Sequence, residues 1–153
     1  MTEVCQQFAA TPARKAILTG FLNLRAESRA RGIKGFQWLA GSFLEQIELL
    51  EERDPGDIDV VTFVREPNTP PAIRAALTGP PDLIDHHQVK ATYSVDHYWV
   101  PLSSNPEAIV DVSRYWYGLF SHRRDRTWKG MLIVDLDSPA DDAGATGVLG
   151  GSP

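Results

Sequence analysis

The chain has 153 residues, of which 42% are hydrophobic and 23% are charged, and its formal net charge is −5. A chain of this length buries enough apolar surface for one core, so we expect a single domain. The lone cysteine, Cys5, excludes an internal disulfide framework, and the longest apolar runs are too short to cross a bilayer. No stretch resembles a secretory signal, and we therefore expect a cytoplasmic protein without a membrane partner.

The first clear helix signal is Thr11-Pro12. Thr is a favoured N-cap residue and Pro suits the first helical position, so a helix is expected to begin here and to run to about residue 31. It has an apolar stripe for packing on a sheet. Residues 1–10 and 137–153 lack comparable patterns, and we expect both segments to be flexible termini.

A short apolar run over residues 36–41 predicts a buried strand that ends at Gly41-Ser42. An amphipathic helical pattern follows from Phe43, with glutamates opposite its apolar side chains. A glycine-containing turn before a helix leaves backbone N–H groups free to bind an anion such as phosphate. Ser42 and Glu45 also fit a capping box, in which Ser42 would only cap the helix. The sequence leaves both interpretations open.

Two carboxylates lead the next strand, which is predicted over residues 58–64. Asp57 and Asp59 follow a turn at Asp54-Pro55-Gly56. Alternate residues of a strand share a face, so these two carboxylates point the same way and repel each other. A bound Mg²⁺ or Mn²⁺ ion removes that cost, because both ions prefer oxygen ligands. Metal-binding carboxylates beside a phosphate-binding turn indicate phosphoryl or nucleotidyl transfer, whereas a solvated strand start is the alternative for an isolated pair.

The middle of the chain adds a third carboxylate. Short helices are expected over residues 72–78 and 82–91, and the second contains the pair His86-His87, which we assign to the surface because adjacent helical residues diverge. Residues 94–100 alternate as a strand with Asp96 among apolar and aromatic neighbours. A carboxylate there is costly unless it is paired or bound to metal. An aspartate at a sheet edge that faces water fits the same pattern.

The last third is predicted to form a helix over residues 107–121 and a strand over residues 129–135. The helix carries an apolar stripe that we expect to face the core and not to stack on a nucleotide base: Ile109, Val110, Tyr115, Trp116, Leu119 and Phe120. Between the two elements lie Arg123, Arg124 and Lys129. These basic residues are candidates to bind a triphosphate or an acidic partner.

Together these motifs resemble the DNA polymerase beta-type nucleotidyltransferase superfamily, which pairs a GS motif with a downstream DxD motif. The chain is most similar to a group of small, mostly uncharacterised prokaryotic nucleotidyltransferase-like proteins. The matching positions are Trp38, Gly41-Ser42-Phe43, Pro55, Asp57 to Phe63, Asp96, Tyr115 to Phe120 and Lys129-Gly130. The resemblance implies a minimal nucleotidyltransferase domain over residues 11–136. It also implies an α/β (α+β) fold, with a small mixed sheet and helices mainly on one face.

The resemblance further implies a metal site. Asp57, Asp59 and Asp96 would be the catalytic residues and would hold two Mg²⁺ (or Mn²⁺) ions. Asp96 would also assist removal of the acceptor's proton. The reaction would move a nucleoside monophosphate from an NTP to a hydroxyl group of a protein, an RNA end or a small molecule.

Phosphate binding is the second implied role. Gly41 and Ser42, with Arg124 and Lys129, would bind the phosphates of the NTP, which we expect to be ATP. Nucleic acid is expected only as an acceptor, because the chain has no second domain to hold a primer.

A binding function is the alternative class. Small members of the superfamily often occur as partners of helical toxin-like proteins, so the resemblance implies a toxin–antitoxin or phage-defence setting for the enzyme as well as for a binding protein. In the binding interpretation the chain is a non-catalytic or regulatory, antitoxin-like partner that uses the same fold.

Overall fold

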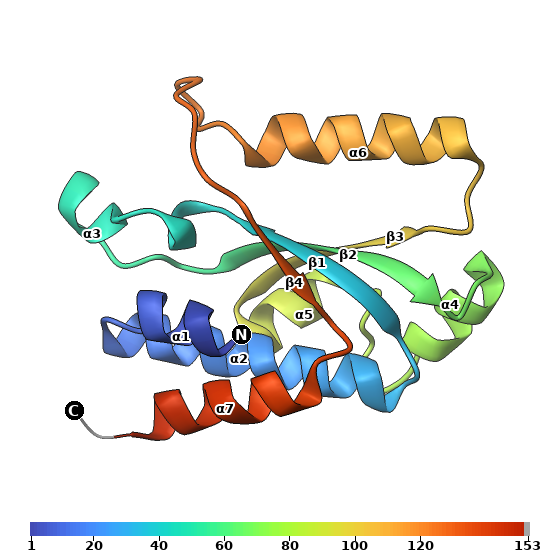
Figure 1. The fold of residues 1–153 in the computed structure, drawn as a ribbon, viewed down its shortest axis with the longest axis horizontal. Coiled ribbons are helices and arrows are strands. Elements are labelled where there is room, and N and C mark those ends of the chain that lie inside the picture. The colour runs from blue at the N-terminus through green and yellow to red at the C-terminus, as the bar shows by residue number, and fades with distance from the viewer. Residues whose placement is uncertain (152–153) are drawn as a thin grey trace.

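In the computed structural model of the protein, residues 1–151 are described (Figure 1). A four-stranded sheet has the order β3-β2-β1-β4, in which β1 runs antiparallel to β2 and β4, and β2 runs parallel to β3. The predicted fold class, a mixed sheet with flanking helices, is therefore confirmed. The elements in chain order are α1 (Thr2–Phe8), α2 (Pro12–Ala30), β1 (Lys34–Ala40), the 3-10 helix η1 (Ser42–Leu44), α3 (Ile47–Leu50), β2 (Ile58–Glu66), α4 (Pro70–Leu77), α5 (His86–Tyr93), β3 (Val95–Pro101), α6 (Pro106–Phe120), β4 (Leu132–Asp135) and α7 (Pro139–Gly150).

Most helices cover one face of the sheet. Helices α1, α2, α5 and α7 lie on that face, and α6 lies on the opposite face (Figure 1). The larger core cluster, on the α2 side, includes Leu39 and Val60, whereas the smaller cluster, on the α6 side, includes Val61, Phe63 and Trp116. Because side chains alternate along a strand, residues of β2 with odd numbers face α6.

Local signals in the sequence predicted the ends of most helices and strands to within a few residues of their observed positions. Thr11 caps α2 as predicted, since its Oγ1 accepts a hydrogen bond from the backbone N–H of Arg14 at 3.2 Å. The four predicted strands are all present, although β4 begins only at Leu132. The helix expected over residues 82–91 begins later, at His86, because the Asp85 side chain caps it there.

Both ends of the described chain are helical, in contrast to the flexible termini that we expected. Helix α1 buries Val4 and Cys5, and α7 packs against α1 and α2. The carboxylate of Asp142 in α7 is buried and accepts hydrogen bonds from Arg25 and Arg29 of α2. These long-range ion pairs order a segment whose own composition is low in bulky side chains. Residues 152–153 of the expected tail lie outside the described residues.

The amphipathic helix expected after Ser42 does not form as one element. The chain instead makes η1 and the single turn α3, with Glu45 extended between them (φ −111°, ψ 163°). Arg14 of α2 provides the physical reason. Its guanidinium donates hydrogen bonds to the backbone carbonyls of Phe43 at 2.6 Å and Glu45 at 2.5 Å. A continuous helix would need those carbonyls for its own hydrogen bonds.

Helix α6 also differs from expectation. Trp116 and Phe120 face the core, with 8% and 3% of their surface exposed. In contrast, Val110, Tyr115 and Leu119 of the predicted inward stripe are 66%, 61% and 53% exposed. Of the described helices, α6 alone crosses this face of the sheet (Figure 1), so no neighbouring helix covers its flanks.

Candidate functional site

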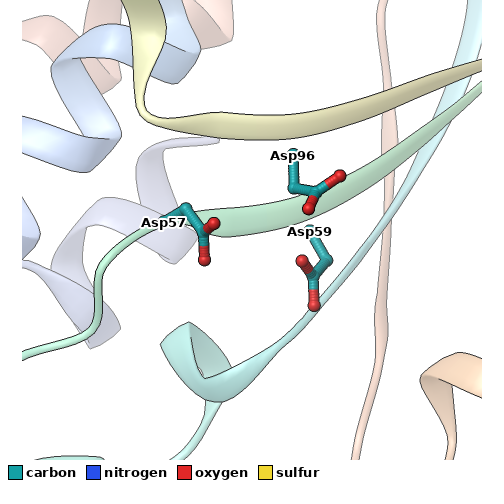
Figure 2. A group of neighbouring side chains, drawn as sticks. All are labelled: Asp57, Asp59 and Asp96. Carbon is teal, nitrogen blue, oxygen red and sulfur yellow. The ribbon is translucent and has the colours of Figure 1, made fainter. Parts of the chain in front are cut away.

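The strand register brings three carboxylates together. Asp59 of β2 and Asp96 of β3 are direct partners on neighbouring parallel strands. Asp57 lies two residues before Asp59 and therefore projects on the same side of the strand. One oxygen of each carboxylate lies within 4.8 Å of the others, and Figure 2 shows the three groups turned toward a common point. Asp57, Asp59 and Asp96 are referred to below as the acidic trio.

The acidic trio is electrostatically strained. Burial, followed by the charges of Asp57 and Asp96, raises the pKa of Asp59 to about 6. The Oδ1 atom of Asp96 is buried and has no hydrogen-bond partner among residues 1–151. Repulsion between like charges and a buried oxygen without a hydrogen bond both cost free energy. A divalent cation bound by carboxylate oxygens would remove both costs, so the residues fit Mg²⁺ or Mn²⁺.

Two basic side chains of α5 flank the trio, and the sequence pattern did not indicate them. Lys90 Nζ lies 2.5 Å from Asp57 Oδ2 and 3.3 Å from Asp96 Oδ2. The hydrogen bond with Asp57 raises the pKa of Lys90. His86 Nε2 lies 3.4 Å from Asp96 Oδ1, whereas the adjacent His87 is exposed. The available signal was the spacing of four residues between His86 and Lys90, which places both on one face of the helix that leads into β3.

Gly41 lies against the trio at the end of β1. Ala40 pairs with Asp59 across the sheet, and Gly41 follows it with a φ of 87°. A Cβ atom at Gly41 would lie 2.7 Å from Asp59 Oδ2 and 3.0 Å from its Cγ. We expected glycine here to leave room for phosphate. The structure gives two further reasons, the positive φ and the closely approaching carboxylate.

Ser42 is the first residue of η1, and the capping-box interpretation is wrong. Gly41 occupies the N-cap position, and within residues 1–151 no side-chain hydrogen bond caps this turn. The backbone carbonyl of Ser42, not its hydroxyl, accepts from the N–H of Glu45 at 3.1 Å. The hydroxyl is thus available for another partner. Because η1 is only three residues long, its dipole adds little to anion binding.

A cleft of about 930 Å³ opens in front of the acidic trio. One side is formed by the strand ends and η1, including Gly41 and Ser42. The other side is formed by the C-terminal half of α6 and the turn after it, including Arg124 and Lys129. The structure therefore places every sequence-predicted metal or phosphate residue on one cleft.

The basic side chains in the turn after α6 make different contacts. Arg123 forms an ion pair with Glu45, so part of its charge is neutralised within the protein. Lys129 acts on the trio itself: its charge lowers the pKa of Asp59, although burial of that carboxylate raises it more. Arg124 and Lys129 are therefore the better candidates in this turn for binding an anionic ligand.

The family model of DUF6932, described as a family of unknown function, matches residues 1–135. The chain belongs to the DUF6932 family. The DUF6932 match contains the whole acidic trio, the basic turn and helix α1, which we had expected to be flexible. No curated protein and no solved structure matches the chain. Within residues 1–151, no helix combines the length and the apolar character needed to cross a bilayer.

Proposed function

We propose that this DUF6932 protein is a metal-dependent nucleotidyltransferase that moves a nucleoside monophosphate from an NTP to an acceptor hydroxyl group. The convergence of Asp57, Asp59 and Asp96 in one cleft carries the proposal. Carboxylates held together against their mutual repulsion, with one strongly shifted pKa, are typical of functional sites. The resemblance of the GS and DxD motifs to the polymerase beta-type superfamily points to the same chemistry.

Each group of residues has a role in this proposal. The acidic trio would hold the divalent cation, which when bound supplies charge neutralisation and polarises a phosphoryl oxygen. Arg124 and Lys129 would bind the phosphates through charge-assisted hydrogen bonds. Gly41 and Ser42 would contact the phosphates from the opposite side of the cleft, through the backbone and the uncommitted Ser42 hydroxyl.

The bond changes in the transfer balance without a redox step. The acceptor hydroxyl oxygen forms a bond to the α-phosphorus, and the bond from that phosphorus to the bridging oxygen breaks. Pyrophosphate leaves with the electron pair. The acceptor's proton passes to a base, and we assign this role to Asp96, as the resemblance to the nucleotidyltransferase superfamily implies.

Product analysis tests the proposal directly. The purified protein is incubated with each α-labelled NTP, Mg²⁺ and candidate acceptors, including the protein itself, and both pyrophosphate and labelled product are measured. We expect both to appear with the wild type and to disappear in Asp57→Asn and Asp59→Asn. Pyrophosphate that is released equally by these variants would show that the trio is not the catalytic site.

The antitoxin-like binding function is the second candidate, and the exposed apolar surface of α6 favours it. Val110, Tyr117 and Leu119 are each at least half exposed, and a helical toxin-like partner would cover them. This candidate predicts that the double variant Asp57→Asn/Asp59→Asn binds its partner normally. It also predicts that Val110→Lys, which leaves the cleft intact, abolishes that binding.

A further inference from the structure

We propose that Tyr98 and Tyr115 form an aromatic wall of the cleft on which the planar base of a nucleotide stacks. This inference rests on the proposed function, because it names where in the same site the base of the NTP lies. The inward stripe predicted for residues 107–121 assigned Tyr115 to the core. Its exposure and its place on the cleft lining change that assignment.

Tyr98 adjoins the metal site through the strand itself. It lies two residues after Asp96 in β3, so both side chains project from the same face, about 7 Å apart along the strand. Tyr98 is 41% exposed and lines the cleft. Trp116 supports the ring at a centroid distance of 4.7 Å, and His86 lies 5.0 Å away. The ring is therefore held in place while part of it stays open.

Tyr115 extends the wall from the α6 side. It is 61% exposed and lines the cleft. Its ring meets Trp116 edge to face, at 5.1 Å and an interplanar angle of 80°. Trp116 is itself buried and packs on Phe120 at 5.4 Å. One buried tryptophan thus anchors both tyrosines and limits the conformational entropy that the wall would lose when a ligand binds.

The chemistry of the wall suits a nucleobase. Tyrosine rings stack with any base, because every base has a π-face, and such stacking contributes substantially to binding in proteins that recognise single-stranded nucleic acids. The trio and the basic turn recognise the charged end of an NTP, whereas the wall offers aromatic surface to its uncharged end. Since stacking reads no hydrogen-bond pattern, this wall favours binding of several NTPs with similar affinity over strict selection of ATP.

Calorimetric titration with ATP and with inorganic tripolyphosphate, each in Mg²⁺, separates the base from the phosphates. We expect Tyr115→Ala to weaken ATP binding by about 5- to 150-fold, the range that stacked bases show, and to leave tripolyphosphate binding unchanged. Tyr115→Phe should keep wild-type affinity, because it keeps the ring. Tyr98→Leu should also weaken ATP binding, with a melting curve to verify that it folds.

Tyr117 provides the matched control. It lies on the same helix and is 50% exposed, but it is not part of the cleft lining. Tyr117→Ala should therefore leave ATP binding unchanged. Equal ATP affinity of wild type and Tyr115→Ala, or equal losses for ATP and tripolyphosphate, overturns the aromatic wall and leaves the transferase proposal standing. A wild-type protein that binds neither compound overturns both.

Discussion

At the scale of single residues, Asp59 combines burial with two neighbouring negative charges. Its pKa is raised from 3.8 to about 6, by burial first and then by the charges of its two neighbours. The folded protein therefore holds this proton more tightly than the unfolded chain does. As pH rises from about 4 through 6, the unfolded chain loses the proton first, so this residue's contribution lowers the stability of the metal-free fold over that window.

Thermal melts between pH 4 and pH 8 in EDTA test this contribution. We expect the melting temperature of the wild type to fall relative to that of Asp59→Asn as pH rises through the window, because asparagine has no proton to release. Saturating Mn²⁺ should reverse the difference at pH 7, since only the wild type keeps the full ligand set. Parallel melting curves for the two proteins in EDTA at all pH values would contradict the shifted pKa.

Gly41 lies against the same carboxylate. Gly41→Ala places a Cβ atom 2.7 Å from Asp59 Oδ2 in a backbone with positive φ, so we expect it to displace the carboxylate, to weaken Mn²⁺ binding and to cost about 1 kcal/mol or more of stability. Gly56→Ala is the control: Gly56 lines the same cleft, and a Cβ atom there would meet no described atom within 4 Å. Calorimetry and melting curves measure both effects. If the two alanines behave alike, the close approach to Asp59 has no consequence.

Lys90 competes with any cation for Asp57 and Asp96. We expect Lys90→Met to increase Mn²⁺ affinity, by up to about fivefold for a pair that is partly exposed, while it lowers the stability of the metal-free protein. Lys34→Met removes the same charge from an exposed pair with Glu66 and should change neither quantity appreciably. Weaker Mn²⁺ binding in Lys90→Met would instead indicate that the lysine positions the carboxylates.

At the scale of elements, the sequence predicted what depends on neighbours in the chain. The alternation of apolar and polar residues predicted the strands, and the N-cap signal predicted α2. The spacing of Asp57 and Asp59 predicted that they lie on one side of β2. The assignment of Asp96 to the same site depended on the family resemblance, because strand pairing joins residues that are distant in the sequence. The errors arose where a distant side chain decides the outcome. Arg14 redirects the segment after Ser42, and Lys90 reaches the site from a crossover helix.

Arg25, which is fully buried, is another side chain that fixes distant parts of the chain. Its guanidinium binds the Asp142 carboxylate and donates to Gln37 Oε1 at 2.6 Å, which joins α7 to the sheet through α2. We expect Arg25→Leu to destabilise the protein by about 3–5 kcal/mol, because it leaves Asp142 without its main buried partner. Arg114→Leu, at an exposed pair on α6, should change stability little. Chemical denaturation measures both, and a small loss for Arg25→Leu would mean that α7 does not depend on this link.

At the scale of the whole molecule, one face of the sheet forms the larger core and the other face forms the cleft. The face covered by α2 holds the larger core and supplies most of the buried apolar surface. The face under α6 is less completely covered, so the carboxylates of β2 and β3 lie in an accessible cleft instead of a packed interior. The turn after α6 then brings positive charge to the opposite side of that cleft. This asymmetry positions an accessible polar site where the end of β1 meets the first residues of β2 and β3.

The basic turn therefore separates the two candidate functions. Arg124 lines the cleft, whereas Arg126, two residues later in the same turn, is exposed and does not line it. If the protein is an NTP-dependent enzyme, Arg124→Glu replaces a phosphate contact with a repulsion. We then expect the apparent KM for NTP to rise, or kcat to fall, by about tenfold or more, as loss of a charge-assisted hydrogen bond does. Arg126→Glu makes the same change in net charge and should leave both constants near their wild-type values.

If the turn instead binds an acidic partner, both reversals should weaken partner binding in a salt-dependent way and leave NTP affinity unchanged. The comparison of two neighbouring arginines thus tests where the positive charge acts, independently of its total amount.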